Sequence, residues 1–296
     1  MSKRILLTGS QGQLGSEIRQ RVSMMPLMYE LLPTDQADLD ISDLKQVEAA
    51  IAAFKPDVII NAAAYTAVDK AESEPDIAFA VNAKGPENLA KVAVDANIRL
   101  IHISTDYVFN GQQCSPWKID DPVEPINVYG ESKLAGEQAI QRYHTDTIII
   151  RTAWVYSRYG NNFVKTMINL MNARNEIGVI CDQIGTPTHA GRLAEICLSA
   201  IDHPDCKGLY HWTDAGVASW YDFAQAVYEI GSSLGLINNL CQVNAITTAD
   251  YPTPAQRPNF SVMDCQQSRK DFGFARHWRE QLYMMLQELQ QEGFNA

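Results

Sequence analysis

Short apolar runs alternate with longer stretches of helical periodicity through the first half of the chain. The runs are RILLTG, YELLPTD, PDVIINAAA, IRLIHIST and DTIIIRTAW, at residues 4–9, 29–35, 56–64, 98–105 and 146–154. Between them lie segments of roughly 10 to 20 residues with the mixed pattern of crossover helices. Continuous apolar strands separated by helices indicate a parallel sheet that is buried on both faces. We therefore predict an α/β fold with a doubly wound, Rossmann-type parallel sheet.

The alternation loosens after about residue 155. Helical patterns are expected at 162–173, 190–201, 219–233 and 278–290, with short strands near 177–181 and 208–212. We predict a dinucleotide-binding Rossmann domain over residues 1–155 and a smaller, mainly substrate-binding α/β lobe over residues 156–296. The two are free to exchange segments, and the ligand cleft is expected between them.

Composition narrows the class of protein. The net charge of −11 argues against nucleic acid as a partner, because such binding calls for a basic face. No apolar run approaches the roughly 20 residues needed to cross a bilayer, and the N-terminal stretch MSKRILLTGS is too short in aliphatic residues for a signal peptide. The six cysteines stand singly, which fits neither a zinc site nor a disulfide framework. We expect a cytoplasmic protein without a membrane partner.

A glycine triplet follows the first apolar run. Gly9, Gly12 and Gly15 stand at three-residue spacing and lead into a helical pattern. Glycine permits the tight turn and the close approach of backbone to a pyrophosphate, and the helix N-terminus supplies free N–H groups and positive dipole. The triplet alone is a weak signal, but its position between a strand and a helix indicates a dinucleotide site. The alternative is a plain strand–turn–helix.

The ends of the next two strands supply further candidates. Asp35 lies 20 residues after Gly15, where a carboxylate accepts hydrogen bonds from ribose hydroxyls and repels a 2′-phosphate. This favours NADH over NADPH, although an aspartate in a turn is the competing interpretation. Ala62, Ala63 and Ala64 follow the third strand, where small side chains let a cofactor lie against the backbone or simply pack tightly.

The fourth strand and the following helix carry the chemistry. Ser104 and Thr105 put hydroxyls at a strand end, and Tyr129 precedes Lys133 by four residues, so the last two share a helix face. A phenol is a poor acid–base group at neutral pH, and we predict that the neighbouring ammonium and the positive charge of the oxidised nicotinamide lower the pKa of Tyr129. Lys133 is also expected to hold the hydroxyls of the nicotinamide ribose. The alternative is an exposed Tyr and Lys on a helix, since this spacing is common by chance. Together with the glycine loop, the pattern favours reduction of a ketone, with the proton from Tyr129.

Six segments together resemble the extended short-chain dehydrogenase/reductase superfamily and, within it, the dTDP-4-dehydrorhamnose reductases. They are TGSQGQLG, NAAAYTAVDKAE, ISTDYVFNG, YGESKLAGE, RTAWVYSRYGNNFVKTM and DQIGTPTHA, and they span the chain from Lys3 to the region of Arg257. The resemblance implies reduction of the 4-keto group of dTDP-4-dehydro-L-rhamnose by NAD(P)H, which gives dTDP-L-rhamnose for polysaccharide biosynthesis.

The resemblance also implies roles for individual residues. The catalytic set is Tyr129 as proton donor, Lys133 as its partner and Thr105 as the third member. The residues implied on the pyrophosphate are Gly12, Gln13 and Leu14. Those implied on the substrate side are Thr105, Asp106, Tyr107, Trp154, Asn162 and Arg257. Tyr107 is further expected to tune the acid. Arg257 suits a diphosphate clamp, with a structural ion pair as the alternative.

Two departures bear on related families. Some bacterial relatives dimerise through magnesium held by acidic residues, one of which falls just after GTPT, where this chain reads His189, Ala190, Gly191 and Arg192. We therefore predict no metal and a monomer or weak homodimer. A nucleotide-sugar dehydratase would follow Thr105 with an Asp-Glu pair, but the chain has Asp106-Tyr107. Another nucleotide-sugar reductase, an epimerase, and a non-catalytic, cofactor-binding regulatory subunit remain as alternatives.

Overall fold

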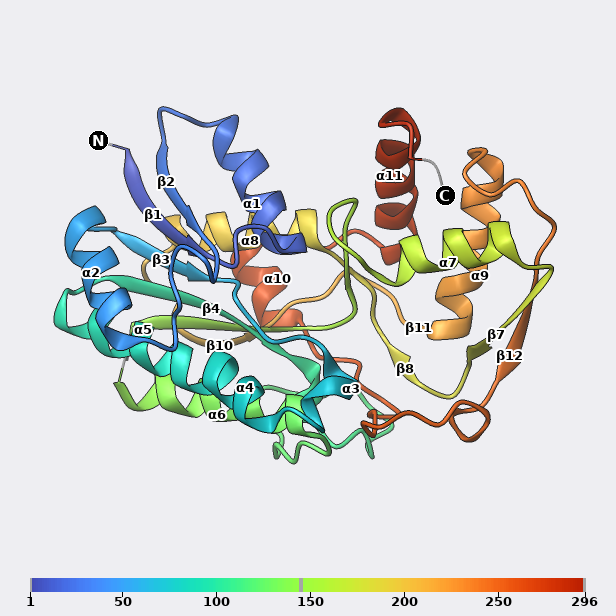
Figure 1. Cartoon of the computed structure of the whole chain (residues 1–296), viewed down its shortest axis with the longest axis horizontal. Helices are drawn as coiled ribbons and strands as arrows, with labels where there is room; N and C mark the ends of the chain where they lie inside the picture. The colour runs from blue at the N-terminus through green and yellow to red at the C-terminus, as the bar shows by residue number, and fades with distance from the viewer. Residues whose placement is uncertain (1, 144–145, 295–296) are drawn as a thin grey trace.

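Six parallel strands form the central sheet of the computed structural model, which describes residues 2–143 and 146–294 (Figure 1). They are β1 (Lys3–Thr8), β2 (Tyr29–Thr34), β3 (Val58–Asn61), β4 (Arg99–Thr105), β5 (Thr147–Thr152) and β10 (Gly208–His211). Their order is β10-β5-β4-β3-β1-β2, and every neighbouring pair is parallel. The chain therefore changes direction across the sheet between β1 and β3, which is where doubly wound sheets bind ligands.

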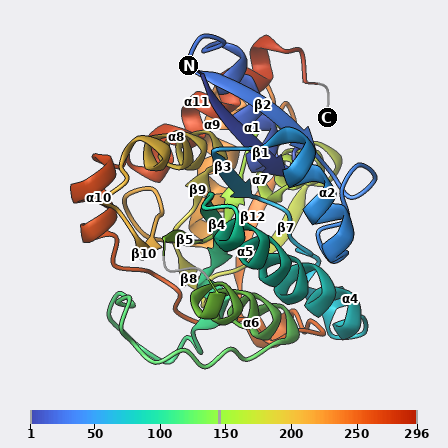
Figure 2. The same ribbon diagram turned by 90° about the vertical axis from the view of Figure 1, so that its left-hand side faces the viewer.

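Helices cover both faces of this sheet because its strands are apolar on both sides. In β1, Ile5 and Leu7 face one helical layer and Leu6 faces the other, as the alternation of side chains along a strand requires. The first layer contains α1 (Gln13–Ser23) and α8 (Ala190–Asp202). The second contains α2 (Leu44–Phe54), α5 (Gly85–Asp95) and α6 (Val128–Tyr143), and Figure 2 shows the two layers. The predicted α/β fold with a Rossmann-type sheet is confirmed.

The second half of the chain contributes to the same unit. The helix α8 packs on α1, β10 pairs with β5, and α10 (Gln266–Phe272) packs near β10. The buried cluster of this layer accordingly joins Ile18 of α1 to Leu193 and Trp212. The domain boundary near residue 155 remains a prediction. The helices α8 and α10 and the strand β10 follow it in sequence but pack with the first half of the chain.

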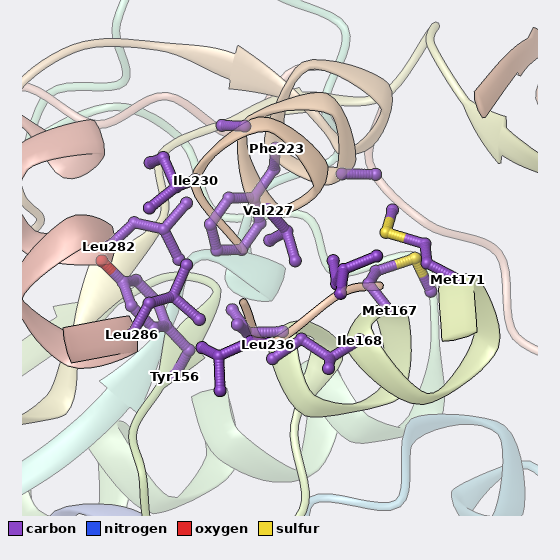
Figure 3. Close-up of a cluster of buried hydrophobic side chains, with 14 of the residues drawn as sticks. Tyr156, Met167, Ile168, Met171, Phe223, Val227, Ile230, Leu236, Leu282 and Leu286 are labelled. Carbon is purple, nitrogen blue, oxygen red and sulfur yellow. The ribbon is translucent and has the colours of Figure 1, made fainter. Parts of the chain in front are cut away.

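A smaller lobe is built around α7 (Phe163–Ala173), α9 (Trp220–Ser233) and α11 (Trp278–Gln291). These helices enclose a cluster of buried apolar side chains, among them Phe223, Val227 and Leu286 (Figure 3). A parallel pair of strands, β7 (Glu176–Ile180) and β12 (Gln242–Ile246), flanks the lobe. The shorter strands are β6 (Val155–Tyr156) paired with β9 (Thr188–His189), and β8 (Ile184–Gly185) paired with β11 (Ala218–Ser219).

The remaining elements are short. They are α3 (Val68–Ala71), α4 (Pro75–Phe79), a π-helix (Ala80–Lys84) and two 3₁₀ turns (Asp106–Val108 and Thr248–Asp250). The helices and strands expected from the sequence are all present. Those not expected are α10, β12 and the short strands β6, β8, β9 and β11. Across the described part of the chain, every helix is too short or too polar to span a membrane.

Candidate active site

A cleft of about 810 Å³ opens at the carboxyl ends of the central strands, with a volume in the range of ligand pockets. Most of the residues predicted for the site line it: Gly9, Gly12, Gln13, Leu14, Gly15, Asp35, Ala62, Ala63, Ala64, Thr105, Asp106, Tyr107, Tyr129, Lys133 and Trp154. The predicted residues that do not line it are Asn162 and Arg257. The sheet thus brings together segments that are far apart in sequence.

The three loop glycines differ in the space that surrounds them. Gly9 has a φ of +67°, and a Cβ there would lie 2.6 Å from the backbone N of Ala63. A Cβ on Gly15 would lie 2.2 Å from the backbone O of Gly9. Gly12 has only that same oxygen nearby, at 3.3 Å, and it borders the cleft. Packing within the protein therefore requires Gly9 and Gly15, whereas Gly12 leaves room on the side of the cleft.

The N-terminus of α1 faces the same space. Its N-cap is Gly12, which has no side chain to cap the first N–H groups, and the first turn carries no acidic residue. Unsatisfied N–H groups and the positive end of the helix dipole favour an anionic group such as a phosphate. The loop and helix therefore have the features of a dinucleotide site.

Asp35 follows β2 directly and is tied to the glycine loop. Its carboxylate accepts hydrogen bonds from the Ser10 hydroxyl at 2.6 Å and from the Gln11 backbone N–H at 3.0 Å. Asp35 therefore orders the loop as well as lining the cleft. Contact with a cofactor ribose remains a prediction.

Thr105 and Tyr129 meet at the end of β4. The Thr105 hydroxyl donates to Asp106 Oδ1 at 3.0 Å and accepts from the Tyr107 N–H at 3.2 Å. Burial raises the pKa of Tyr129 to about 12, while a hydrogen bond with Thr105 acts in the opposite direction. The buried phenol is therefore held protonated at neutral pH.

Burial opposes the lowering of the pKa of Tyr129 that was predicted from Lys133 and the oxidised nicotinamide, and that lowering remains a prediction. Lys133 is buried, and its Nζ donates to the backbone O of Ile103 at 2.6 Å, toward the sheet. Burial also lowers the pKa of Lys133 to about 8, so the ammonium still predominates at neutral pH. Desolvation of the phenol dominates the pKa of Tyr129, and the nearby Asp106 carboxylate adds to it.

Asp106 and Tyr107 surround the phenol. Burial raises the pKa of Asp106 to about 6, although the neighbouring Ser261 and Thr105 hydroxyls lower it. The rings of Tyr107 and Tyr129 meet edge to face, with centroids 5.6 Å apart. Burial and the Asp106 carboxylate raise the pKa of Tyr107 as well. Tyr107 is thus next to the candidate acid, as predicted, and its effect on catalysis remains a prediction.

Trp154 forms an aromatic wall of the cleft with a residue that the sequence did not reveal. Its ring stacks on that of Trp220 with centroids 3.6 Å apart and planes 8° apart. The same ring is close to Gly185, where a Cβ would lie 2.7 Å from Trp154 Cε2. Trp154 also has a φ of +48°, a backbone conformation that is rare for a bulky residue and that often marks functional sites.

The two predicted residues outside the cleft have other contacts. Asn162 caps α7 through a hydrogen bond from the Lys165 N–H, and its amide donates to Gln13 Oε1 at 3.0 Å. Arg257 forms a bidentate ion pair with Asp69, with N–O distances of 3.0 and 2.8 Å. The ion-pair alternative for Arg257 is therefore present in the structure. Substrate contacts by Asn162 and Arg257 remain predictions.

Further residues of the cleft were missed from the sequence. Trp220 comes from α9 of the smaller lobe, Gln36 follows Asp35, and Asn161 precedes the predicted Asn162. The Oγ atoms of Ser104 and Thr152 are buried at adjacent strand ends without a hydrogen-bond partner among the described residues. Thr152 ends a predicted strand, and that position could have identified it, whereas nothing local in the sequence pointed to Trp220.

Over residues 2–143 and 146–294, no group of three or more His, Cys, Asp or Glu side chains could hold a metal ion.

Comparisons with known proteins agree with this geometry. The family model described as RmlD substrate binding domain matches residues 3–291. The dTDP-4-dehydrorhamnose reductase of Escherichia coli K12 is 42% identical, covering 96% of this chain and 97% of that protein. The crystal structure of a dTDP-4-dehydrorhamnose reductase from Clostridium acetobutylicum has a TM-score of 0.91 at 41% identity, covering 97% of this chain and 99% of the other. The enzyme from Bacillus anthracis, solved in complex with NADP, has a TM-score of 0.92 at 36% identity, covering 97% and 100%.

Proposed function

Because the chain belongs to the dTDP-4-dehydrorhamnose reductase family, we propose that it reduces the 4-keto group of dTDP-4-dehydro-β-L-rhamnose to give dTDP-L-rhamnose. The observation that carries this proposal is that one cleft is lined by the glycine loop and by Thr105, Tyr129 and Lys133. Ketone reduction needs a bound hydride donor and a proton donor side by side, and this cleft offers sites for both.

The residues present fit a nicotinamide dinucleotide. Gly12 leaves space between the loop and the cleft, and the uncapped N-terminus of α1 suits a pyrophosphate. Ala62, Ala63 and Asp35 line the same cleft, where they would contact the rest of the dinucleotide. The nicotinamide group, when bound, supplies the hydride.

Tyr129 supplies the proton to the ketone oxygen. A phenol with a pKa of about 12 is fully protonated at neutral pH, so the acid is ready before reduction begins. The alkoxide that forms from the ketone is a stronger base than a phenolate, so the proton moves toward the substrate. The Thr105 hydroxyl lowers the pKa of the phenol, which reduces the cost of forming the phenolate.

The substrate side of the cleft is assigned to residues around the phenol. Asp106 is buried there, with a carboxylate suited to accept hydrogen bonds from sugar hydroxyls. The stacked rings of Trp154 and Trp220 offer apolar surface to a sugar or a base. Asn162 is linked to this region through Gln13, and Arg257 would have to leave Asp69 to reach a diphosphate.

NADH is the proposed preferred cofactor. The Asp35 carboxylate lies at the end of β2 on the lining of the cleft, where its charge opposes a 2′-phosphate. Among the described residues, the Asp35 carboxylate accepts hydrogen bonds from Ser10 and Gln11, and neither of these is a cation. A similar enzyme binds NADP in its crystal, so the choice depends on measurement.

A substrate panel tests the proposal. The purified protein is mixed with NADH or NADPH and with several 4-keto-6-deoxy nucleotide sugars, and the loss of reduced-nicotinamide absorbance is followed. We expect the highest kcat/KM with dTDP-4-dehydro-β-L-rhamnose and NADH. Binding of NADH without oxidation by any sugar of the panel would contradict the proposal and favour a non-catalytic subunit.

A further inference from the structure

Four buried polar side chains form a line beneath the cleft. Thr8 Oγ1 donates to Asn61 Oδ1 at 2.7 Å, and Asn61 Nδ2 lies 3.0 Å from His102 Nδ1. His102 Nε2 lies 3.4 Å from Lys133 Nζ. The four come from β1, β3, β4 and α6, and each is at most 2% exposed. This line connects the catalytic lysine to the strands that carry the glycine loop.

The hydrogen bonds determine which ring nitrogen of His102 carries the proton. The backbone N–H of Ala63 donates to Asn61 Oδ1 at 3.2 Å, so the oxygen of this amide must face Ala63 and Thr8. The Asn61 NH₂ group then faces His102 Nδ1, which can only accept. A neutral ring therefore carries its proton on Nε2, facing Lys133.

We propose that His102 is a positioning residue for Lys133, set in the Nε2–H tautomer by Asn61, and that its N–H opposes an ammonium held against the sheet. An Nε2–H group opposes an ammonium, which has no lone pair, but it can donate to a neutral amine. Such an amine still has two protons, one of which it donates to Ile103 O. The proposal rests on the proposed function, because it concerns the lysine assigned to catalysis.

The surrounding charges are compatible with this arrangement. Burial lowers the pKa of Lys133 to about 8, and Glu137 on the same helix raises it. The Glu137 carboxylate is, however, bound by the Arg151 guanidinium of β5 at 2.7 and 2.9 Å, which offsets its charge. Burial and the neighbouring Lys133 keep the pKa of His102 well below its usual value, so the ring is neutral.

The other ionisable groups near the lysine lie toward the cleft or the surface. Asp106, of the 3₁₀ turn, and Tyr129, of α6, line the cleft, and both have raised pKa values. The charged side chains of α3, α4, α5 and the π-helix, which pack on the outer side of α6, are exposed or half-buried. The contact that faces Lys133 from the sheet is therefore His102 together with the Ile103 carbonyl.

For the reaction, this means that the charge and direction of Lys133 depend on His102 of the sheet. At pH values under its pKa of about 8 the amine takes up a proton, and the ammonium must then turn away from the Nε2–H. The direction away from the sheet is toward the cleft, where Tyr129 and the predicted ribose site lie. His102 thereby biases Lys133 toward the cleft whenever it is charged.

The first test reads the tautomer of the unchanged protein, and a variant serves only to assign the signal. Histidine ¹⁵N shifts of the full chain, with His102 assigned by its loss in His102→Phe, distinguish a protonated ring nitrogen from an unprotonated one. We expect a neutral ring with its proton on Nε2 from pH 6 to 9. A proton on Nδ1, or a doubly protonated ring, would overturn the proposal. This measurement uses neither substrate nor turnover, so it is independent of the reductase assay.

The second test reverses the tautomer. In Asn61→Asp the carboxylate can only accept, so His102 must carry its proton on Nδ1 and present Nε2 as an acceptor to the ammonium. We expect the pKa of Lys133, followed by side-chain NMR of labelled lysine, to rise by about one unit or more. Thr8→Val is the matched control, since Ala63 still orients Asn61, and both tautomer and pKa should remain unchanged.

A double variant separates this route from a simple charge effect. If Asn61→Asp acts through the ring, its effect on the pKa of Lys133 should shrink when His102 is also replaced by Phe. An equal rise with and without the imidazole would overturn the proposal. In the ketone-reduction assay, the same rise should appear as an upward shift in the pH profile of kcat for Asn61→Asp, and an unshifted profile would contradict it.

Discussion

Replacing Gly15 with alanine tests whether the glycine loop is packed as the structure shows. The new Cβ would lie 2.2 Å from the Gly9 carbonyl oxygen and 2.6 Å from Ser10 Cα, both backbone atoms that cannot rotate away. Ordinary contact begins near 3.4 Å, so the helix and loop must separate by about 1 Å. Overpacking of this kind costs about 1–3 kcal/mol. At about 2–4 °C per kcal/mol, Tm should fall by about 2–12 °C.

Gly12→Ala is the matched control, because it makes the same change three residues earlier. Its backbone, at φ −65° and ψ 172°, suits alanine, and its Cβ would meet only the Gly9 oxygen at 3.3 Å. The entropy lost by the unfolded chain stabilises by about 0.4–1 kcal/mol, and the poorer N-cap costs a similar amount. Tm should therefore change by less than about 3 °C. The methyl group enters the cleft, so the Kd for NADH should rise about tenfold or more.

Thermal unfolding and NADH fluorescence titration of both variants give the two readings. We expect Gly15→Ala to lose stability, and Gly12→Ala to lose affinity while keeping its stability. Equal losses of Tm in the two variants, or an unchanged Tm in Gly15→Ala, would refute the packing argument. Unchanged NADH binding by Gly12→Ala would show that the pyrophosphate lies elsewhere.

Three further predictions follow from individual side chains. Asp35→Asn keeps an acceptor for Ser10 but removes the charge, so the ratio of kcat/KM for NADH over NADPH should fall; an unchanged ratio would make Asp35 a loop residue only. Glu137→Ala leaves the buried Arg151 guanidinium unpaired and should lower the free energy of unfolding in urea by about 3–5 kcal/mol. The exposed control Glu30→Ala should lower it by about 1 kcal/mol or less. Equal losses in the two variants would be contrary to this reasoning. Burial raises the pKa of Asp214 to about 7 from an ordinary 3.8, so the protein loses stability as the pH rises through that range. Asp214→Asn should therefore stabilise the protein at pH 8 and not at pH 4. An equal gain at both pH values would disprove this assignment.

Local patterns were sufficient to predict much of the fold and the site. The strand ends carrying Gly9, Asp35, Ala63 and Thr105 could be found because a parallel sheet gathers the carboxyl ends of its strands at one edge. Tyr129 could be placed with them because its helix follows β4 in sequence. These predictions depended on short-range periodicity and on the topology that it implies.

The contacts that were missed depend on segments far apart in sequence. The pairing of β10 with β5 joins residues about 60 positions apart, and the short run at 208–211 says nothing of its partner. Trp220 reaches the cleft through the packing of the smaller lobe. The direction of Lys133 depends on the carbonyl of Ile103 and on His102, and helical spacing alone predicted a contact with Tyr129 instead.

The central claim is that Tyr129 is the proton donor of a ketone reductase, and Tyr129→Phe tests it most directly. The variant removes one hydroxyl, so it should still bind NADH with a Kd close to that of the unchanged protein. Tyr210→Phe is the control, because the Tyr210 hydroxyl bonds to Asp271 and does not line the cleft. We expect kcat for dTDP-4-dehydro-β-L-rhamnose to fall by about 10²–10⁴-fold in Tyr129→Phe and to be retained in Tyr210→Phe. A Tyr129→Phe protein that turns over at a rate near that of the control would show that Tyr129 is not the proton donor.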